Sequence, residues 1–147
     1  MVCLGNICRS PLAHGILESK LPTDKFYVDS AGTGNYHIGA PPDERSIKVA
    51  KKYGLDISNQ RCRQFQISDF DHFDLIFVMD ESNFKTVLKL ARNPLDISKV
   101  HLILGAENPI LKNVPDPYYG DYKDFEHVFA LLENSCEIIS KELQIAK

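Results

Sequence analysis

Short apolar runs alternate along the chain with segments whose apolar residues recur at helical spacing. Three runs have the length and composition of strands, at residues 25–30, 75–79 and 100–104. The second run is continuously apolar, which is typical of a parallel strand covered on both faces. This alternation predicts βαβ units and a parallel sheet.

Helical patterns accompany these strands. We expect four helices, which begin at Pro11 and near Asp43, Glu81 and Asp124. Gly54 is a natural end for the second helix, and Asn93-Pro94 for the third. The last helix carries a long apolar stripe, formed by Phe125, Val128, Phe129, Leu132, Cys136, Ile139 and Leu143. Such a stripe predicts a core-facing helix and not a binding site.

The apolar lead-in to Cys3 supplies a fourth strand. The predicted fold is therefore α/β: a single doubly wound domain over residues 1–147, with a four-stranded parallel sheet and helices on both faces. Only Met1 and Val2 precede Cys3, so we expect a very short first strand, either because the strand is truncated or because the numbering starts late. Residues 104–114 are the most irregular stretch and are expected to form an exposed loop.

The segment Cys3-Leu-Gly-Asn-Ile-Cys-Arg-Ser-Pro11 has the features of an anion-binding loop. Gly5 and Asn6 allow unusual backbone conformations, so successive N–H groups can turn inward as a nest. Ser10 is expected to cap a helix whose first residue is Pro11, which adds positive potential at the same place. A bound phosphate would contact the residues of this loop, namely Leu4, Gly5, Asn6, Ile7, Cys8 and Ser10.

Two side chains give the loop a chemical use. Cys3 would lie in the positive field, which favours the nucleophilic thiolate over the thiol. Arg9 offers a planar fork that binds two phosphate oxygens. The spacing of a cysteine, five residues and an arginine is weak by itself, since a buried strand cysteine followed by a solvated helical arginine gives the same pattern. The two interpretations are about equal at this point.

A second segment, Val114-Pro-Asp-Pro-Tyr-Tyr-Gly-Asp121, contributes a carboxyl group. The prolines on either side hold Asp116 on a stiff loop, where it could protonate a leaving alkoxide or phenolate. Tyr118 and Tyr119 offer a wall for an aromatic leaving group. Taken alone, this segment is better explained as a proline-rich surface turn.

Taken together, the two segments closely resemble the motifs of the low-molecular-weight protein tyrosine phosphatases. Further landmarks of that family follow in the expected order, at Asp29-Ser-Ala-Gly-Thr33, Tyr36, Arg63-Gln64 and Phe73-Asp-Leu-Ile-Phe-Val-Met-Asp-Glu-Ser-Asn83. The resemblance implies that Cys3 is the nucleophile, Arg9 the phosphate-binding arginine and Asp116 the general acid.

The resemblance also implies supporting roles. Ser10 would hydrogen-bond the thiolate, and Asn6 would hold the loop in shape with help from Ser30. The substrate cleft would be lined by Tyr36, Tyr118 and Tyr119. One departure is Gln60, where many relatives carry a histidine; a glutamine keeps the hydrogen bonds but does not titrate.

The composition limits the partners, location and cofactors that we expect. With a net charge of −3 over 147 residues, neither nucleic acid nor an anionic membrane is an expected partner. No apolar run approaches the ~20 residues of a membrane span and no signal peptide is visible, so we expect a cytoplasmic protein. The cysteines and histidines lack metal-ligand spacing, and neither a metal nor another cofactor is expected.

The resulting prediction is a metal-independent protein tyrosine phosphatase that works through a phosphocysteine. Its expected partners are phosphotyrosine proteins and a tyrosine kinase, and we expect a monomer. Two alternatives remain. An arsenate reductase shares the loop, but this chain has no close cysteine pair outside it and keeps the acid loop. A non-catalytic phosphate-binding module would not need Asp116.

Cys8 adds a hypothesis about redox control. It shares the short loop with Cys3, so a modest backbone change could bring the two sulfurs within bonding distance. A thiolate that peroxide has oxidised to a sulfenic acid could then be captured as a disulfide. A role as space-filling is nearly as well supported. Cys62 and Cys136 are expected to be small core residues.

Overall fold

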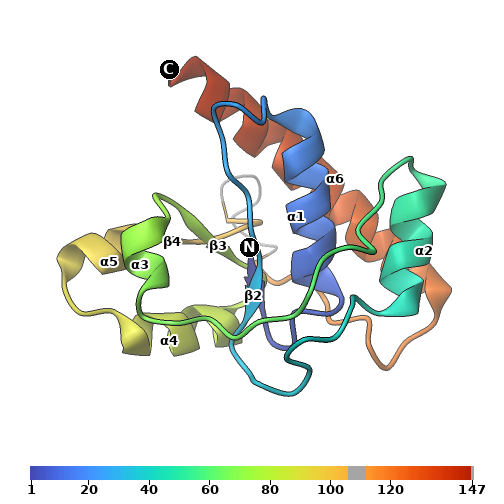
Figure 1. The fold of residues 1–147 in the computed structure, drawn as a ribbon, viewed down its shortest axis with the longest axis horizontal. Helices are drawn as coiled ribbons and strands as arrows, with labels where there is room; N and C mark the ends of the chain where they lie inside the picture. Colours follow the sequence, from blue (N-terminus) through green and yellow to red (C-terminus); the bar gives the residue numbers. More distant parts are fainter. Residues whose placement is uncertain (106–111, 147) are drawn as a thin grey trace.

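A computed structural model describes residues 1–105 and 112–146 (Figure 1). Its four-stranded sheet is parallel throughout and has the strand order β2-β1-β3-β4. The strands are β1 (Val2–Cys3), β2 (Ala31–Gly32), β3 (Ile76–Val78) and β4 (Val100–Leu102). The helices are α1 (Arg9–Lys20), α2 (Glu44–Lys52), α3 (Asp69–His72), α4 (Glu81–Leu90), α5 (Pro94–Ser98) and α6 (Tyr122–Ile145). The predicted fold class is confirmed.

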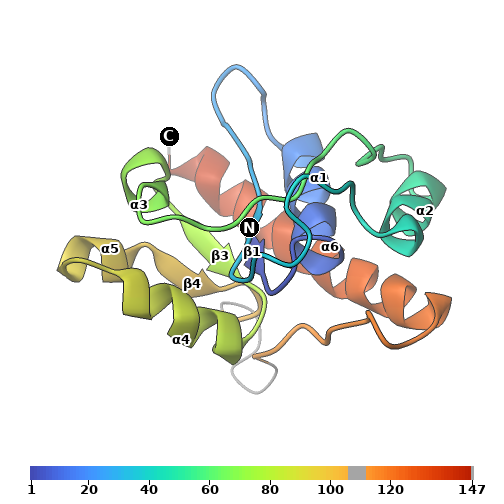
Figure 2. The same ribbon diagram turned by 60° about the horizontal axis from the view of Figure 1, so that its bottom comes forward.

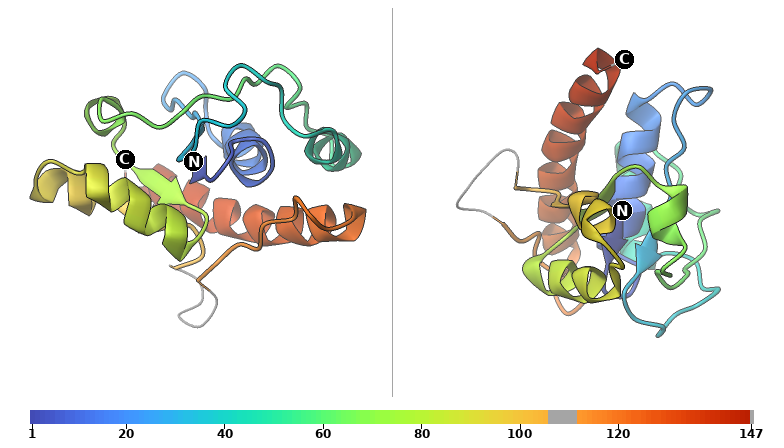
Figure 3. Two further views of the ribbon diagram at one scale, coloured as in Figure 1. Left: turned by 90° about the horizontal axis from the view of Figure 1, so that it is seen from below. Right: turned by 90° about the vertical axis from the view of Figure 1, so that its left-hand side faces the viewer.

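The helices form a layer on each face of the sheet (Figures 1 and 2). On one face, α1, α2 and α6 pack against one another, and α1 runs alongside α6 (Figure 3). The stripe predicted on the last helix faces this layer, with Phe125, Val128, Leu132 and Cys136 almost completely buried. On the other face, α3 and α4 cover a second cluster that includes Phe70, Val78 and Val87. The sheet is therefore covered on both sides, as the continuously apolar run at 75–79 predicted.

Three of the expected helices begin within two residues of their predicted starts, and each has an acidic N-cap. Asp43 caps α2, and Gly54 follows its end with φ of 82°. Asp80 caps α4 by accepting a hydrogen bond from the N–H of Asn83. Asp121 caps α6 in a reciprocal pair with Asp124, which extends this helix two residues ahead of the predicted start.

The first helix differs from the prediction. It begins at Arg9, with Cys8 at the N-cap position, so the assignment of Ser10 as N-cap is wrong. The Ser10 hydroxyl instead turns towards Cys3, with the two side-chain atoms 3.1 Å apart. Pro11 is the third helical residue, where its missing N–H still costs no intrahelical hydrogen bond.

The strand predicted at 25–30 is also wrong. The paired register begins later, with Val2 opposite Ala31 and Cys3 opposite Gly32. Residues 25–30 precede that register and form no ladder, and strand β2 therefore consists of Ala31–Gly32 alone. The short helices α3 and α5 were not predicted, and Asn93 both follows α4 and caps α5.

Two further expectations concern the ends of the elements. The first strand is indeed very short, with only Val2–Cys3 in a central position of the sheet. Residues 106–111 of the loop expected at 104–114 lie outside the described residues. Among the helices that the structure describes, none is long and apolar enough to cross a membrane.

Candidate active site

The loop between β1 and α1 lies at the carboxyl end of a central strand, the position where ligands bind in open parallel sheets. Asn6 has φ of 58°, and it is the one non-glycine residue with positive φ among the described residues. This left-handed residue turns the backbone so that the Asn6 N–H donates to Cys3 Sγ at 3.2 Å. The predicted loop therefore curls around the sulfur of Cys3.

The side chain of Asn6 fixes the conformation of the loop through three hydrogen bonds. Its Nδ2 donates to Ser10 Oγ at 2.7 Å and to Ser30 Oγ at 3.1 Å. Its Oδ1 accepts from the backbone N–H of Arg63 at 3.0 Å. Ser10 Oγ in turn lies 3.1 Å from Cys3 Sγ. These contacts join the loop to α1, to the residue before β2 and to the segment around Arg63 that pairs with Gly32.

Two neighbours pack directly against the loop backbone. A Cβ on Gly32 would lie 2.9 Å from the Leu4 carbonyl oxygen and 3.1 Å from the Asn6 nitrogen, so glycine is required for this close approach. Cys62 Sγ donates to the Asn6 carbonyl oxygen at 2.7 Å. Burial raises the pKa of the Cys62 thiol to about 11 and keeps it protonated as a donor.

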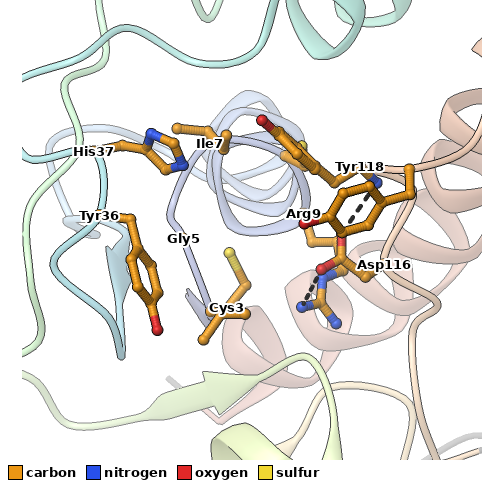
Figure 4. Close-up of a pocket in the computed structure, with 11 residues that line it drawn as sticks. Cys3, Gly5, Ile7, Arg9, Tyr36, His37, Asp116 and Tyr118 are labelled. Atoms are coloured by element: carbon orange, nitrogen blue, oxygen red, sulfur yellow. Dashed lines mark hydrogen bonds and ion pairs between the residues drawn. The ribbon is translucent and has the colours of Figure 1, made fainter.

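Arg9 lies almost completely buried, with 3% of its side chain exposed. Its Nη1 donates to Asp80 Oδ2 at 2.7 Å and to the Val114 carbonyl oxygen at 3.0 Å. Its Nη2 lies 3.6 Å from Asp116 Oδ2. Asp80 therefore anchors one side of the guanidinium, and the other side faces the pocket and the carboxylate of Asp116 (Figure 4).

Asp116 lies on the loop before α6, with 43% of its side chain exposed. Its Oδ1 accepts from the N–H of Tyr118 at 3.1 Å. Arg45 of α2 fixes the same loop by donating to the Tyr118 carbonyl oxygen at 2.9 Å and to that of Gly120 at 3.2 Å. The acid is thus tied to α2 while its carboxylate still reaches the pocket.

A pocket of about 430 Å³ opens over Cys3. Its lining consists of Cys3, Leu4, Gly5, Ile7, Cys8, Arg9, Tyr36, His37, Asp116, Tyr118 and Tyr119. Figure 4 shows Tyr36 and His37 on one side of Cys3, with Asp116 and Tyr118 on the other. The structure therefore brings nearly all the predicted site residues together. Asn6 and Ser10 are the exceptions, because both are buried beneath the loop and do not line the pocket.

Several residues that shape the site were not singled out from the sequence, namely His37, Asp80, Arg45 and Gly32. Gly32 and Asp80 lie within segments that resembled family landmarks, and His37 lies beside one, which is the signal that could have identified them. Gln60 supports the first turn of α1 by donating to the Pro11 carbonyl oxygen at 3.1 Å. Within the described ranges, no group of three or more potential ligands could hold a metal ion.

Cys8 lies in the pocket lining but is only 4% exposed. Burial, together with the charges of Asp43 and of Cys3, raises the pKa of its thiol. Cys8 is thus held as a protonated thiol in the same loop as Cys3. Cys62 and Cys136 are both buried, as predicted.

A thiol that accepts a loop N–H, a buried arginine and a carboxyl group across the pocket define the class of cysteine-dependent phosphatases. A family model described as low molecular weight phosphotyrosine protein phosphatase matches residues 1–147. The chain belongs to this family.

Similar proteins and solved structures support the same family assignment. The low molecular weight phosphotyrosine protein phosphatase of Gallus gallus is 42% identical over 142 residues, which covers 92% of this chain and 89% of the relative. The human protein of the same name is 41% identical, with coverage of 92% and 88%. A crystal structure of a protein tyrosine phosphatase from Entamoeba histolytica, with Hepes in its active site, superposes with a TM-score of 0.92. It is 37% identical, with coverage of 99% and 95%.

Proposed function

We propose that this protein hydrolyses phosphotyrosine and aryl phosphomonoesters through a phosphocysteine intermediate, without a metal. The observation that carries the proposal is the convergence of Cys3, Arg9 and Asp116 on one pocket. Membership of the phosphatase family and the aromatic lining at Tyr36 and Tyr118 support an aryl phosphate as substrate.

In the first step, the Cys3 thiolate attacks phosphorus in line with the leaving oxygen. A sulfur–phosphorus bond forms as the phosphorus–oxygen bond breaks, and protonated Asp116 gives its proton to the departing phenolate. The loop amides and the inner side of the Arg9 guanidinium hold the three equatorial oxygens, over which the transition-state charge is spread. Asp80 keeps Arg9 in place through the 2.7 Å contact.

In the second step, water replaces the phenol. Asp116, now a carboxylate, takes a proton from this water as its oxygen attacks phosphorus. The sulfur–phosphorus bond breaks, inorganic phosphate leaves, and Cys3 returns as a thiolate. The Ser10 hydroxyl, 3.1 Å from Cys3 Sγ, stabilises the thiolate as the leaving group.

The biological setting is a further part of the proposal. We propose that the chain is a single phosphatase domain over residues 1–147, that it acts as a cytoplasmic monomer, and that its substrates are phosphotyrosine proteins, with a tyrosine kinase as a further partner. The net charge of −3 argues against nucleic acid and anionic membranes as partners.

Redox control through Cys8 is proposed on the same site. Peroxide converts the Cys3 thiolate to a sulfenic acid, and attack by the Cys8 sulfur forms the disulfide and releases water. Cys8 is held as a thiol by burial, so Cys3 is the sulfur that reacts first.

A metal-free assay of the wild type and Cys3→Ser tests the function. The wild type should hydrolyse p-nitrophenyl phosphate in the presence of a chelator, and Cys3→Ser should show no turnover while still binding vanadate. Arsenate with thiols is run in parallel. Arsenate reduction without phosphatase activity would support the reductase, and phosphate binding without either reaction would support a binding module.

A further inference from the structure

A continuous series of hydrogen bonds runs from Cys3 to His14, a residue of α1 to which the sequence assigned no role. Cys3 Sγ and Ser10 Oγ are 3.1 Å apart, and Asn6 Nδ2 lies 2.7 Å from Ser10 Oγ and 3.1 Å from Ser30 Oγ. Ser30 Oγ in turn is 3.2 Å from His14 Nδ1. The nucleophile is thus linked to an imidazole outside the pocket lining.

The direction of these hydrogen bonds follows from one backbone donor. The N–H of Arg63 donates to the side chain of Asn6, which identifies that atom as Oδ1 and leaves Nδ2 to donate to both serines. Ser10 accepts from Asn6, so its own proton can point to Cys3 Sγ at 3.1 Å or to the Ala31 carbonyl oxygen at 3.4 Å. When Cys3 is a thiolate, its charged sulfur is the stronger acceptor. Ser30 also accepts from Asn6 and needs an acceptor for its proton elsewhere.

That acceptor is His14 Nδ1. The other ring nitrogen, Nε2, lies 3.4 Å from the carboxylate of Glu18 and therefore carries the ring proton, which leaves Nδ1 as the acceptor. Burial lowers the pKa of His14, and the Met1 amino group lowers it further, whereas Glu18 and Asp29 act in the opposite direction. The imidazole is therefore neutral near pH 7, the state in which Nδ1 can accept.

We infer that His14 is a positioning residue for the nucleophile. By taking the proton of Ser30, His14 keeps Ser30 Oγ turned as an acceptor towards Asn6. The amide of Asn6 is thereby fixed as a donor to Ser10, and Ser10 is fixed as a donor to the Cys3 thiolate. The inference rests on the proposed function, because it requires Cys3 to react as a thiolate.

Alkylation of Cys3 by iodoacetamide as a function of pH tests the inference without turnover. His14→Phe removes the acceptor, whereas His14→Asn keeps a polar oxygen near the Nδ1 position that cannot titrate. His127→Asn, on the exposed side of α6, is the matched control. Peptide mass spectrometry assigns the label to Cys3.

His14→Phe should move the pH midpoint of Cys3 alkylation upward by roughly half a unit to one unit, because the partly buried hydrogen bond between His14 and Ser30 is lost. At a pH below the midpoint this is an alkylation rate about 3- to 10-fold lower. His14→Asn should stay near the wild type, and kcat with p-nitrophenyl phosphate should follow the same order while the inhibition constant of phosphate changes less.

Ser30→Ala provides a second variant in case the phenylalanine disturbs folding. It should shift the midpoint as His14→Phe does, and the double variant should show no larger shift than either single one. An unchanged midpoint in His14→Phe and Ser30→Ala, or an additive double variant, would overturn the inference. Because wild-type alkylation at Cys3 is measured separately, this result is distinct from a failure of the phosphatase assignment, which would appear as absent turnover.

Discussion

Substitution of Arg9 by lysine preserves the positive charge and removes the planar fork. In the structure, Nη1 already donates to Asp80 and to the Val114 carbonyl oxygen, at 2.7 and 3.0 Å. Nη2, on the pocket side, lies 3.6 Å from Asp116. A lysine has one ammonium group for these places, so it cannot hold Asp80 and two phosphate oxygens with the same geometry.

The expected loss can be worked from this geometry. Arg9→Lys removes at least one charged donor from the equatorial oxygens in the transition state. Loss of one preorganised donor to a developing oxyanion costs about 100- to 1,000-fold in kcat. We therefore expect Arg9→Lys to reduce kcat/KM by about 100- to 1,000-fold. Since the lost contact is made mainly in the transition state, kcat should fall about as much as kcat/KM.

Steady-state kinetics with p-nitrophenyl phosphate measure this loss, with urea unfolding to confirm that the variant is folded. Arg92→Lys is the matched control, because Arg92 pairs with Asp71 and Asp96 on the outer face and is 40% exposed. Its kcat/KM should equal that of the wild type. An Arg9→Lys enzyme within a few-fold of the wild type would show that charge alone suffices, and the argument from bidentate geometry would be wrong.

Three further predictions concern the acid, the loop and the second thiol. Asp116→Asn should slow aryl phosphates with poor leaving groups far more than activated ones, and equal slowing across a leaving-group series would place the proton donor elsewhere. Gly32→Ala should lower kcat/KM about tenfold, because the added Cβ displaces the loop backbone. Gly54→Ala, at φ of 82°, should lower the free energy of unfolding by about 1 kcal/mol and leave kcat/KM unchanged. Similar kinetics for the two variants would contradict the role of Gly32. Peroxide should inactivate the wild type reversibly, phosphate should protect it, and Cys8→Ala should recover poorly with thiols; a Cys8→Ala enzyme that recovers as well as the wild type, with no Cys3–Cys8 link in mass spectra, would end the redox proposal.

Elements with a repeated pattern could be predicted from the sequence. The stripe of α6 spans several helical turns, α2 follows the acidic residue Asp43, and the apolar residues of α4 recur at helical spacing, so local signals were enough. Strand β2 has two residues, and its position depends on the register with β1, which no local pattern records. The four- and five-residue helices α3 and α5 are similarly too short to show a period.

In the active site, too, features recorded in local sequence could be predicted, and features that depend on tertiary contacts could not. The segments around Cys3 and Asp116 contain the chemistry within a few consecutive residues, and their motifs led to the pocket directly. Ser10 was misassigned as a helix cap because its actual partners, Asn6 and Cys3, are chosen by the folded loop. Gly32 lies within a segment that resembled a family landmark, but the reason for a glycine there becomes visible only when β2 lies against the loop.

The phosphocysteine is the central claim, and rapid-quench trapping of the enzyme during turnover of p-nitrophenyl phosphate tests it most directly. Peptide mass spectrometry under conditions that preserve the sulfur–phosphorus bond should find one phosphoryl group on Cys3. The amount of this phosphocysteine should increase in Asp116→Asn with an activated substrate, because the carboxylate that activates water for its hydrolysis is missing. Turnover in the wild type with no phosphoryl group on Cys3, or with the group on another residue, would contradict the mechanism.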